Sequence, residues 1–261
     1  MKYKTIGILG GMGPLATLDF ERKLLSMVEA KKDQDYPTII SFNDPSIPDR
    51  TEALKGKGES PLQKLIDNAE KLKNSGAEVI CMPCNTAHAY LPALMSFVAD
   101  VKFVDMIDAT ISVIERLRVQ RVGVLCTDGT RLSRVYDAAL EKRGLTSIYP
   151  NHDEQKHLVM DAIYGPTGIK SGNMFTGRVL LEQAAKSLVK NGAQCVVLGC
   201  TEIAMALDTG EVPYLDTSAI LAKTALDKAD MTKSESLNHS TVTLFARFRG
   251  LSGSNPLVRA T

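Results

Sequence analysis

The sequence predicts an α/β protein of two similar lobes, each built on a parallel sheet of the four-stranded type flanked by helices, with a pseudo-twofold axis between them. Short β-branched runs alternate with helical patterns, an order typical of parallel sheets covered on both faces. The same landmarks also recur at one offset: 116 residues separate Gly7 from Gly123, and 116 separate Gly76 from Gly192. A fixed offset over most of the chain indicates a duplicated half. We therefore expect the active site in the cleft between the lobes.

The first half opens with a short apolar strand at residues 4–9, followed by helical spacing over 14–31. A second strand is expected over 38–42. Residues 61–73 carry apolar side chains at every third or fourth position, which predicts an amphipathic helix, and the glycine that follows is a typical helix end. Residues 78–82 are then expected to form the next strand.

The second half repeats this order, with strand 121–126, helix 130–143, a loop-rich middle, helix 178–190 and strand 194–198. Two short strands, at 102–104 and 212–215, are expected to carry the chain between the lobes. The spacing of these elements matches that of the first half, so the two halves should adopt the same fold.

The predicted division of the chain is one lobe of residues 1–104 with about 214–230, a second lobe of 105–213, and a remainder of 231–261. That remainder is rich in small polar residues and has no counterpart in the repeat. We expect it to be a flexible tail without a catalytic role.

Composition argues against several classes of partner. Because 31 basic residues face 30 acidic ones, there is no electrostatic reason to expect binding to nucleic acid or an anionic membrane. No apolar run approaches the length that spans a bilayer, and the first residues lack a signal-peptide pattern. The five cysteines are an odd number inside apolar runs, which favours free thiols in a reducing compartment. We expect a cytoplasmic protein that acts on a small molecule.

Two of these cysteines stand at equivalent positions, since Cys84 and Cys200 are also 116 residues apart. Each follows a predicted strand, and ligands of parallel α/β sheets bind beyond the carboxyl ends of the strands. A pseudo-twofold axis would bring the two thiols face to face across the cleft. A 1,1-proton transfer needs this arrangement, with one group removing a proton from one face of a carbon and a similar group supplying one to the other. A cysteine titrates near pH 8.5, so it can serve in either role.

The alternative for any cysteine in an apolar strand is an inert buried thiol, and we assign that role to Cys81, Cys126 and Cys195. The residues that follow the two equivalent cysteines begin predicted helices, where backbone N–H groups can hold a carboxylate and stabilise a developing enediolate. We therefore expect substrate contacts from Asn85, Thr86, Thr201 and Glu202.

Three segments together resemble one known family: Gly10 to Thr17, Pro83 to His88, and Leu198 to Glu202. They are similar to the aspartate/glutamate racemase family, and most similar to its aspartate racemases, over residues 4 to about 228. The resemblance implies a homodimer of two-lobed subunits that uses neither pyridoxal phosphate nor a metal. It also implies a thiolate/thiol pair that interconverts L- and D-aspartate. Glutamate, a broader set of amino acids, another dicarboxylate, or non-catalytic amino-acid binding remain open.

The resemblance further implies a clamp for the substrate. Arg50 and Lys170 match the family's carboxylate-binding cations, although both residue types are more often solvated surface charges. Thr127 is expected to bond the substrate at the end of strand 121–126, and Met12 to lie over the site. The remaining predicted contact is Gly199.

Other motifs favour different chemistry less strongly. Residues 11–16 fit the dinucleotide pattern G-x-G-x-x-A but lack an acidic residue at the required spacing, so a tight turn before a helix is the preferred interpretation. Cys81 and Cys84 form a C-x-x-C pair typical of thiol oxidoreductases, and His88 would add a third zinc ligand. Redox chemistry would leave Cys200 unexplained, and no second C-x-x-C or paired histidine follows that would complete a zinc site. The glycine- and lysine-rich residues 55–61 lack the order of a phosphate-binding loop and are expected to form a mobile loop that closes over substrate.

Overall fold

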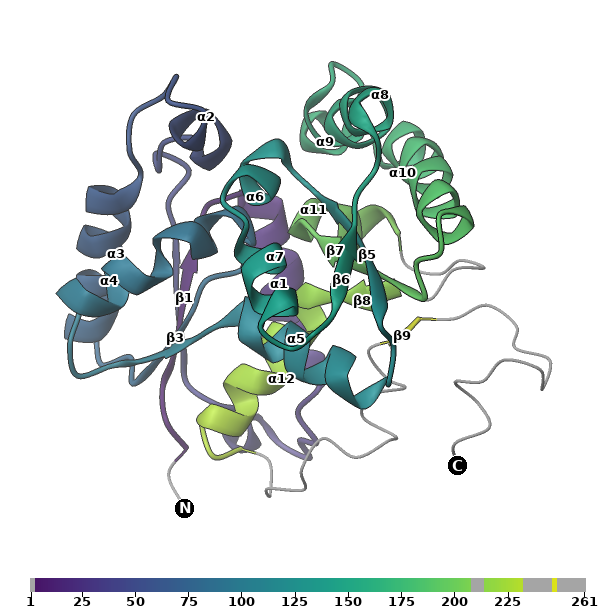
Figure 1. The fold of residues 1–261 in the computed structure, drawn as a ribbon. Coiled ribbons are helices and arrows are strands. Elements are labelled where there is room, and N and C mark those ends of the chain that lie inside the picture. Colours follow the sequence, from purple (N-terminus) through teal and green to yellow (C-terminus); the bar gives the residue numbers. More distant parts are fainter. Residues whose placement is uncertain (1–2, 208–213, 232–245, 248–261) are drawn as a thin grey trace.

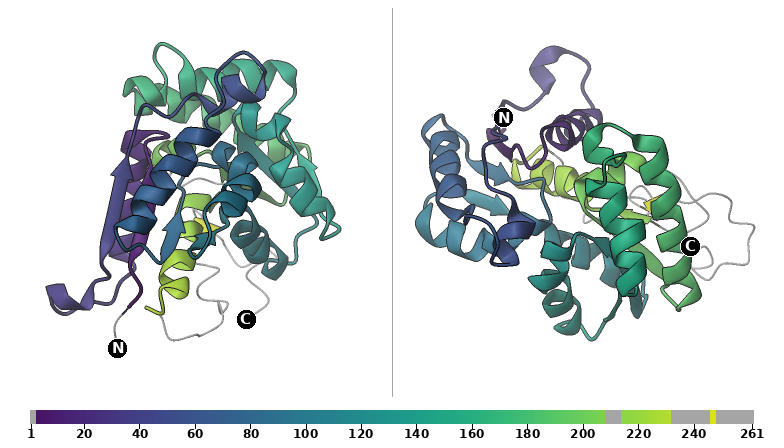
Figure 2. Two further views of the ribbon diagram at one scale, coloured as in Figure 1. Left: turned by 90° about the vertical axis from the view of Figure 1, so that its left-hand side faces the viewer. Right: turned by 90° about the horizontal axis from the view of Figure 1, so that it is seen from above.

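The computed structural model describes residues 3–207, 214–231 and 246–247, and it contains two α/β lobes side by side (Figures 1 and 2). The first sheet is entirely parallel, with the order β2-β1-β3-β4. Its strands are β1 (Ile6–Gly10), β2 (Ile39–Asn43), β3 (Val79–Cys81) and β4 (Lys102–Val104). The second sheet has the order β6-β5-β7-β8-β9. Its strands are β5 (Arg121–Cys126), β6 (Thr146–Ile148), β7 (Cys195–Gly199), β8 (Tyr214–Asp216) and β9 (Ala246–Arg247).

Both sheets therefore place the first strand of each half between the second and third, which confirms the predicted fold class. The difference is β9, a two-residue strand that pairs antiparallel with β8 and extends the second sheet beyond four strands. Every residue of β1 and β7 is buried, because helices cover both faces of each sheet.

The helices of the first half are α1 (Pro14–Ser26), α2 (Arg50–Leu54), α3 (Leu62–Asn74), α4 (Leu91–Phe97) and α5 (Met106–Arg116). Those of the second half are α6 (Asp128–Leu132), α7 (Val135–Glu141), α8 (His152–Glu154), α9 (Asp161–Tyr164), α10 (Met174–Lys190), α11 (Thr201–Ala206) and α12 (Thr217–Lys228). Short 3-10 turns lie at Asp33–Asp35, Thr86–Tyr90 and Ile169–Ser171, and Gln155–Met160 is a π-helix. None of the helices in the described part of the chain combines the length and the apolar character of a membrane-spanning segment.

Two predicted helices differ in extent. The one expected over 14–31 ends at Ser26, and the one expected over 130–143 is divided into α6 and α7. The break lies at Arg134, whose φ of 55° is in the left-handed region that interrupts a right-handed helix. By contrast, α3 forms as its pattern predicts and buries Leu65 and Leu72 against the first sheet.

The last helix of each half crosses to the opposite lobe. Helix α5 follows β4 but packs in the core of the second sheet, where Ile111 and Ile114 meet Val122. Helix α12 follows β8 but packs against α1 and the first sheet, where Leu221 meets Phe20. This exchange ties the lobes together through their hydrophobic cores.

The predicted lobe boundary differs from the pairing at β8. Residues 214–230 were assigned to the first lobe, but β8 pairs with β7 in the second sheet, and only the helix that follows packs on the first. A buried ion pair joins these parts, with Lys23 Nζ of α1 lying 3.0 Å from Asp216 Oδ2. Most of the tail expected at 231–261 lies outside the described residues.

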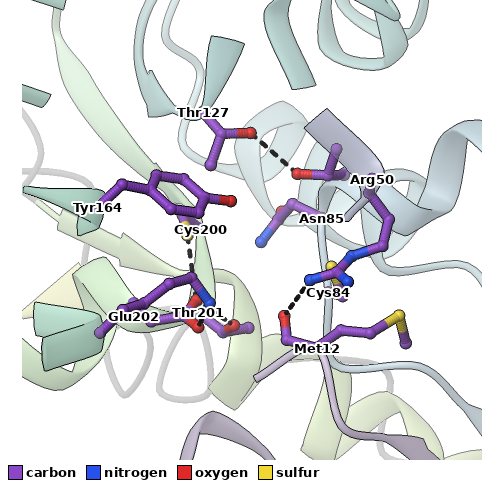
Figure 3. A pocket seen from close by; sticks show the side chains of 11 residues that line it. Met12, Arg50, Cys84, Asn85, Thr127, Tyr164, Cys200, Thr201 and Glu202 are labelled. Atoms are coloured by element: carbon purple, nitrogen blue, oxygen red, sulfur yellow. Dashed lines mark hydrogen bonds and ion pairs between the residues drawn. The ribbon is translucent and has the colours of Figure 1, made fainter. Parts of the chain in front are cut away.

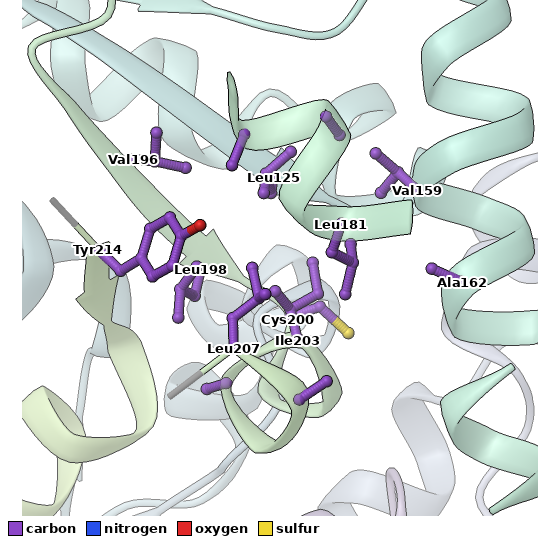
Figure 4. Close-up of a cluster of buried hydrophobic side chains, with 14 of the residues drawn as sticks. Leu125, Val159, Ala162, Leu181, Val196, Leu198, Cys200, Ile203, Leu207 and Tyr214 are labelled. Atoms are coloured by element: carbon purple, nitrogen blue, oxygen red, sulfur yellow. The ribbon is translucent and has the colours of Figure 1, made fainter. Parts of the chain in front are cut away.

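The core of the second lobe positions one of the two equivalent cysteines. On one face of the sheet, Leu125 and Leu198 pack against Leu181 of α10 and Ile203 of α11 (Figure 4). Cys200 lies at the edge of this cluster and is 7% exposed. The thiol is therefore held by a rigid strand end and a buried helix.

Candidate active site

Cys84 lies just beyond the carboxyl end of β3 and is 6% exposed. The turn that carries it is fixed by His88, whose Nε2 accepts the Met106 N–H at 3.0 Å and whose Nδ1 donates to the Cys84 carbonyl at 2.8 Å. Burial lowers the pKa of His88, which keeps the ring neutral in this role. Both ring nitrogens are thus used to tie the Cys84 turn to the start of α5, rather than to ligate an ion.

Cys200 caps α11 immediately after β7, the equivalent position in the second half. Its Sγ lies 3.2 Å from Glu202 Oε2, which also accepts the Thr201 hydroxyl at 3.2 Å. Burial raises the pKa of the Cys200 thiol well above its ordinary value, and the Glu202 charge raises it further. The thiol form is therefore favoured at this sulfur.

The two cysteines line one pocket between the lobes (Figure 3). Its lining consists of Met12, Arg50, Cys84, Asn85, Thr86, Thr127, Tyr164, Lys170, Cys200, Thr201 and Glu202. This set includes every predicted site residue except Gly199. A Cβ on Gly199 would meet Cys126 Cβ and the Leu125 carbonyl at 3.0 Å each, so this glycine serves close packing behind the pocket.

Arg50 is the buried cation of the first lobe. Its Nη1 donates to the Ile47 and Pro48 carbonyls at 3.1 and 3.0 Å, and Nη2 lies 3.4 Å from the Met12 carbonyl. Within the described part of the chain, its buried Nε has no hydrogen-bond partner. Burial lowers the pKa of Arg50, but the neighbouring acidic groups, Cys84 first and then Asp49, together raise it by more. The guanidinium is thus held in place as a cation with one donor unused.

Lys170, the other predicted clamp residue, does not reach the pocket as a free cation. It stands on the turn Ile169–Ser171 and forms an ion pair with Glu202 Oε1. Its Nζ also lies 5.5 Å from the ring centroid of Tyr164. Burial raises the pKa of Glu202, but the charge and hydrogen bond of Lys170 and the contact with Cys200 together lower it by more, so the pair is ionised. Any substrate contact by Lys170 must compete with this carboxylate.

Asn85, beside Cys84, has its amide orientation set by a chain of hydrogen bonds. The Tyr136 hydroxyl donates to Asn85 Oδ1 at 2.6 Å, and Asn85 Nδ2 donates to Thr217 Oγ1 at 3.2 Å. Thr217 Oγ1 in turn donates to the Leu198 carbonyl at 2.9 Å. Because Tyr136 occupies the oxygen, the amide nitrogen faces the pocket, with its second hydrogen available (Figure 3).

A second polar cluster joins the lobes at the other side of the pocket. The hydroxyls of Thr86, Thr127 and Thr130 bond one another at 2.8–3.1 Å. Gly129 allows α6 to lie close to the first lobe, since a Cβ there would lie 2.7 Å from Thr51 Oγ1 and 2.9 Å from Thr86 Cγ2. The contact between α2 and α6 therefore depends on a residue without a side chain.

Two other predicted segments have structural explanations. Gly11 has a φ of 99°, and a Cβ there would lie 2.1 Å from the Asp44 carbonyl oxygen, so packing accounts for this glycine without a nucleotide. The Asp44 carboxylate accepts hydrogen bonds from Ser46 and Asn68, which lower its pKa to about 2. In the loop expected to close over substrate, Lys55 pairs with Asp128 of the second lobe at 3.0 Å.

Sequence reasoning missed Tyr164 and Tyr136. Tyr164 lies at the end of α9, in a stretch that the sequence shows only as loop-rich, and no pattern there indicates that its side chain turns into the pocket. Tyr136 occupies an ordinary helical position in α7, and its contact with Asn85 spans 51 residues of sequence. Neither contact has a local signal.

The pattern of the Asp/Glu/hydantoin racemase family matches residues 9–225. The chain is 30% identical over 228 residues to the broad specificity amino-acid racemase RacX of Bacillus subtilis, covering 85% of this chain and 96% of RacX. Among solved structures, it is similar to Picrophilus torridus aspartate racemase, with 31% identity, a TM-score of 0.77, and coverage of 87% and 94% of the two chains. An aspartate racemase homologue from Pyrococcus horikoshii has 27% identity, a TM-score of 0.69, and coverage of 87% and 99%.

The two-lobed α/β fold and these similarities identify the chain as an amino-acid racemase, which is an isomerase. The chain belongs to the Asp/Glu/hydantoin racemase family.

Proposed function

We propose that this protein interconverts L- and D-aspartate without pyridoxal phosphate, using Cys84 and Cys200 as the two acid–base groups. The observation that carries this proposal is that both sulfurs, from equivalent strand ends of the two halves, line one pocket. The thiolate of one cysteine removes the α-proton, and the S–H of the other supplies a proton to the opposite face. The enantiomer that binds decides which sulfur acts as the base.

The pocket offers groups for both ends of the substrate. The α-proton of an amino acid is very weakly acidic, so the negative charge that develops on deprotonation must be stabilised by preorganised donors. The free amide hydrogen of Asn85 and the unused Nε of Arg50 are donors of this kind, and both are buried. Burial strengthens their electrostatic effect, because little water competes for the carboxylate.

The charges of the pocket favour a dicarboxylic amino acid. Apart from the reacting sulfurs, the lining residues carry two cations, Arg50 and Lys170, against the single carboxylate of Glu202. The second cation balances the thiolate that the mechanism requires, and Arg50 keeps a buried Nε donor that can bind the side-chain carboxylate of aspartate or glutamate. A neutral amino acid would leave that buried donor without a partner.

A broader specificity is the second candidate, favoured by the similarity to the broad specificity racemase RacX. Aspartate and glutamate differ by one methylene, which a pocket discriminates by only about 1–3 kcal/mol. We also propose the homodimer that the family resemblance implies and the cytoplasmic location that the free cysteines favour. Size-exclusion chromatography with light scattering tests the first of these.

The deciding experiment is chiral chromatography of amino acids incubated with the purified protein without added cofactor. The panel should contain both enantiomers of aspartate and glutamate, together with alanine and lysine. We expect racemisation of aspartate above that of all others. Comparable rates across the panel would support the broad-specificity alternative, and binding of aspartate without inversion would support a non-catalytic binding protein.

A further inference from the structure

We propose that Glu202 holds the catalytic proton of the resting enzyme on Cys200, so that Cys84 is the sulfur that starts as the thiolate. This assignment rests on the proposed two-cysteine function and adds a polarity to it, meaning which of the two sulfurs carries the proton in the resting enzyme. The duplicated halves would by themselves make the two sulfurs equivalent, and the structure shows where that equivalence is broken.

The two halves differ in residue type at the second position after each cysteine. At the offset of 116 residues, Thr86 is the counterpart of Glu202, so a hydroxyl in one half stands where the other half has a carboxylate. The Thr86 hydroxyl is bound to Thr127 and Thr130, whereas the Glu202 carboxylate turns back to Cys200. The same helix position therefore serves the lobe contact in one half and the reacting sulfur in the other.

The contact of Glu202 with Cys200 requires a hydrogen between them. An ionised carboxylate can only accept hydrogen bonds, and its Oε2 lies 3.2 Å from the Cys200 Sγ. Both residues are nearly excluded from solvent, at 5% and 7% exposure. A thiolate in that place would face a negative charge at contact distance with little water to screen it, which is unfavourable. The proton is therefore favoured on Cys200.

Cys84 has different neighbours. The charged side chain beside it is the Arg50 guanidinium, a buried cation (Figure 3). Among the described residues that line the pocket, Glu202 is the one carboxylate, and it is turned toward Cys200. A negative charge on the Cys84 sulfur is thus stabilised by Arg50.

The remaining ionisable groups around the pocket do not reverse this polarity. Lys170 is paired with Glu202 and its charge lowers the pKa of Cys200, but by less than the Glu202 charge raises it. Burial raises the pKa of Tyr164 above its ordinary value, which keeps it neutral. Tyr136 behind Cys200 is neutral for the same reason. Asp49 lies near Arg50 but outside the pocket lining.

This polarity has a consequence for turnover. The enantiomer whose α-hydrogen faces Cys84 can react with the resting enzyme without a prior proton exchange. Its α-hydrogen passes as a proton to the Cys84 sulfur. The Cys200 S–H bond breaks, and that proton goes to the opposite face of the carbon. The enzyme is left with the proton on Cys84, and exchange with water restores the resting state. The equilibrium constant between enantiomers is one, so kcat/KM is equal for the two, and the asymmetry is confined to kcat and KM separately.

The test is alkylation by iodoacetamide as a function of pH, without substrate, with mass spectrometry of the peptides that contain each cysteine. We expect Cys84 to react at lower pH than Cys200. Replacing the carboxylate by Glu202→Gln should raise the alkylation rate of Cys200 at pH 7 at least tenfold, about one pKa unit, with a smaller change at Cys84. Burial raises the pKa of Cys195 to about 12, so that thiol serves as an unreactive internal reference.

The matched control is Glu182→Gln, which removes a carboxylate that is paired with Arg178 on α10, outside the pocket. It should leave both profiles unchanged, and circular dichroism should show that each variant folds. Equal profiles for the two cysteines in the unmodified protein, or an unchanged Cys200 profile in Glu202→Gln, would overturn the assignment. The order of labelling in the unmodified protein decides the matter even if the variant does not fold. Absence of racemisation with the expected labelling order would instead count against the proposed function alone.

Discussion

Replacing Tyr136 by phenylalanine tests how the orientation of Asn85 is maintained. The Tyr136 side chain is fully buried and its hydroxyl donates to Asn85 Oδ1 at 2.6 Å. The substitution removes that donor and leaves a buried acceptor without it, at a cost of about 1–3 kcal/mol. For a chain of this size, each kcal/mol lowers the midpoint of thermal unfolding by roughly 2–4 °C. The expected decrease in Tm is therefore about 2–12 °C.

The same change should affect catalysis. Without the Tyr136 hydroxyl, the amide of Asn85 can rotate and present its oxygen to the substrate carboxylate, where it repels instead of binding. We expect kcat/KM for aspartate to fall at least tenfold, which corresponds to about 1.4 kcal/mol of lost transition-state stabilisation. Initial rates of aspartate racemisation give this value, and differential scanning calorimetry gives the Tm.

The matched control is Tyr36→Phe, because Tyr36 is 41% exposed and lies outside the pocket. Its stability should change by no more than about 0.5 kcal/mol and its kinetics not at all. If Tyr136→Phe behaves like this control in both measurements, the hydroxyl does not orient Asn85, and the inference that this amide donates to substrate fails.

Three further substitutions test other contacts. Arg50→Lys keeps the charge but loses the planar donors, so we expect kcat/KM for aspartate to fall at least tenfold; a change below twofold argues against a bound carboxylate. Gly129→Ala forces a side chain against Thr86 and should destabilise the protein by about 1–3 kcal/mol in urea unfolding, with an unchanged midpoint speaking against tight lobe packing. The Asp44 pKa of about 2 lies below its ordinary value of 3.8, so its stabilisation is present above about pH 4 and is lost as the pH falls toward 2. Asp44→Asn should therefore show a shallower loss of stability between pH 4 and 2, and equal slopes would contradict this.

Much of the fold could be predicted because its signals are local and repeated. Strand and helix patterns recur at the offset that links Gly7 to Gly123, and that repetition indicated the two sheets. The predicted division already grouped α5 with the second lobe and α12 with the first, where their apolar faces pack. It grouped β8 with the helix that follows it, whereas β8 pairs with β7 of the second sheet, because strand pairing has no signal in the local pattern.

In the site, too, the sequence predicts positions that follow from the repeat but not contacts that depend on tertiary packing. Cys84 and Cys200 could be located from symmetry and strand ends, and the structure places them at one pocket. The ion pair of Lys170 with Glu202 could not be predicted, because it depends on how a turn folds back over 32 residues of sequence. Tyr164 was missed for a similar reason. Contacts set by tertiary packing, rather than by spacing along the chain, remain beyond sequence reasoning.

The most direct test of the two-sulfur mechanism is exchange of the α-hydrogen of L- and D-aspartate in D₂O by the variants Cys84→Ala and Cys200→Ala, with Cys195→Ala as the matched control outside the pocket. We predict that each pocket variant exchanges the hydrogen of only one enantiomer, the opposite one in each case, without inverting it. The control should racemise both. Full racemisation by either pocket variant would show that one sulfur suffices and would contradict the mechanism.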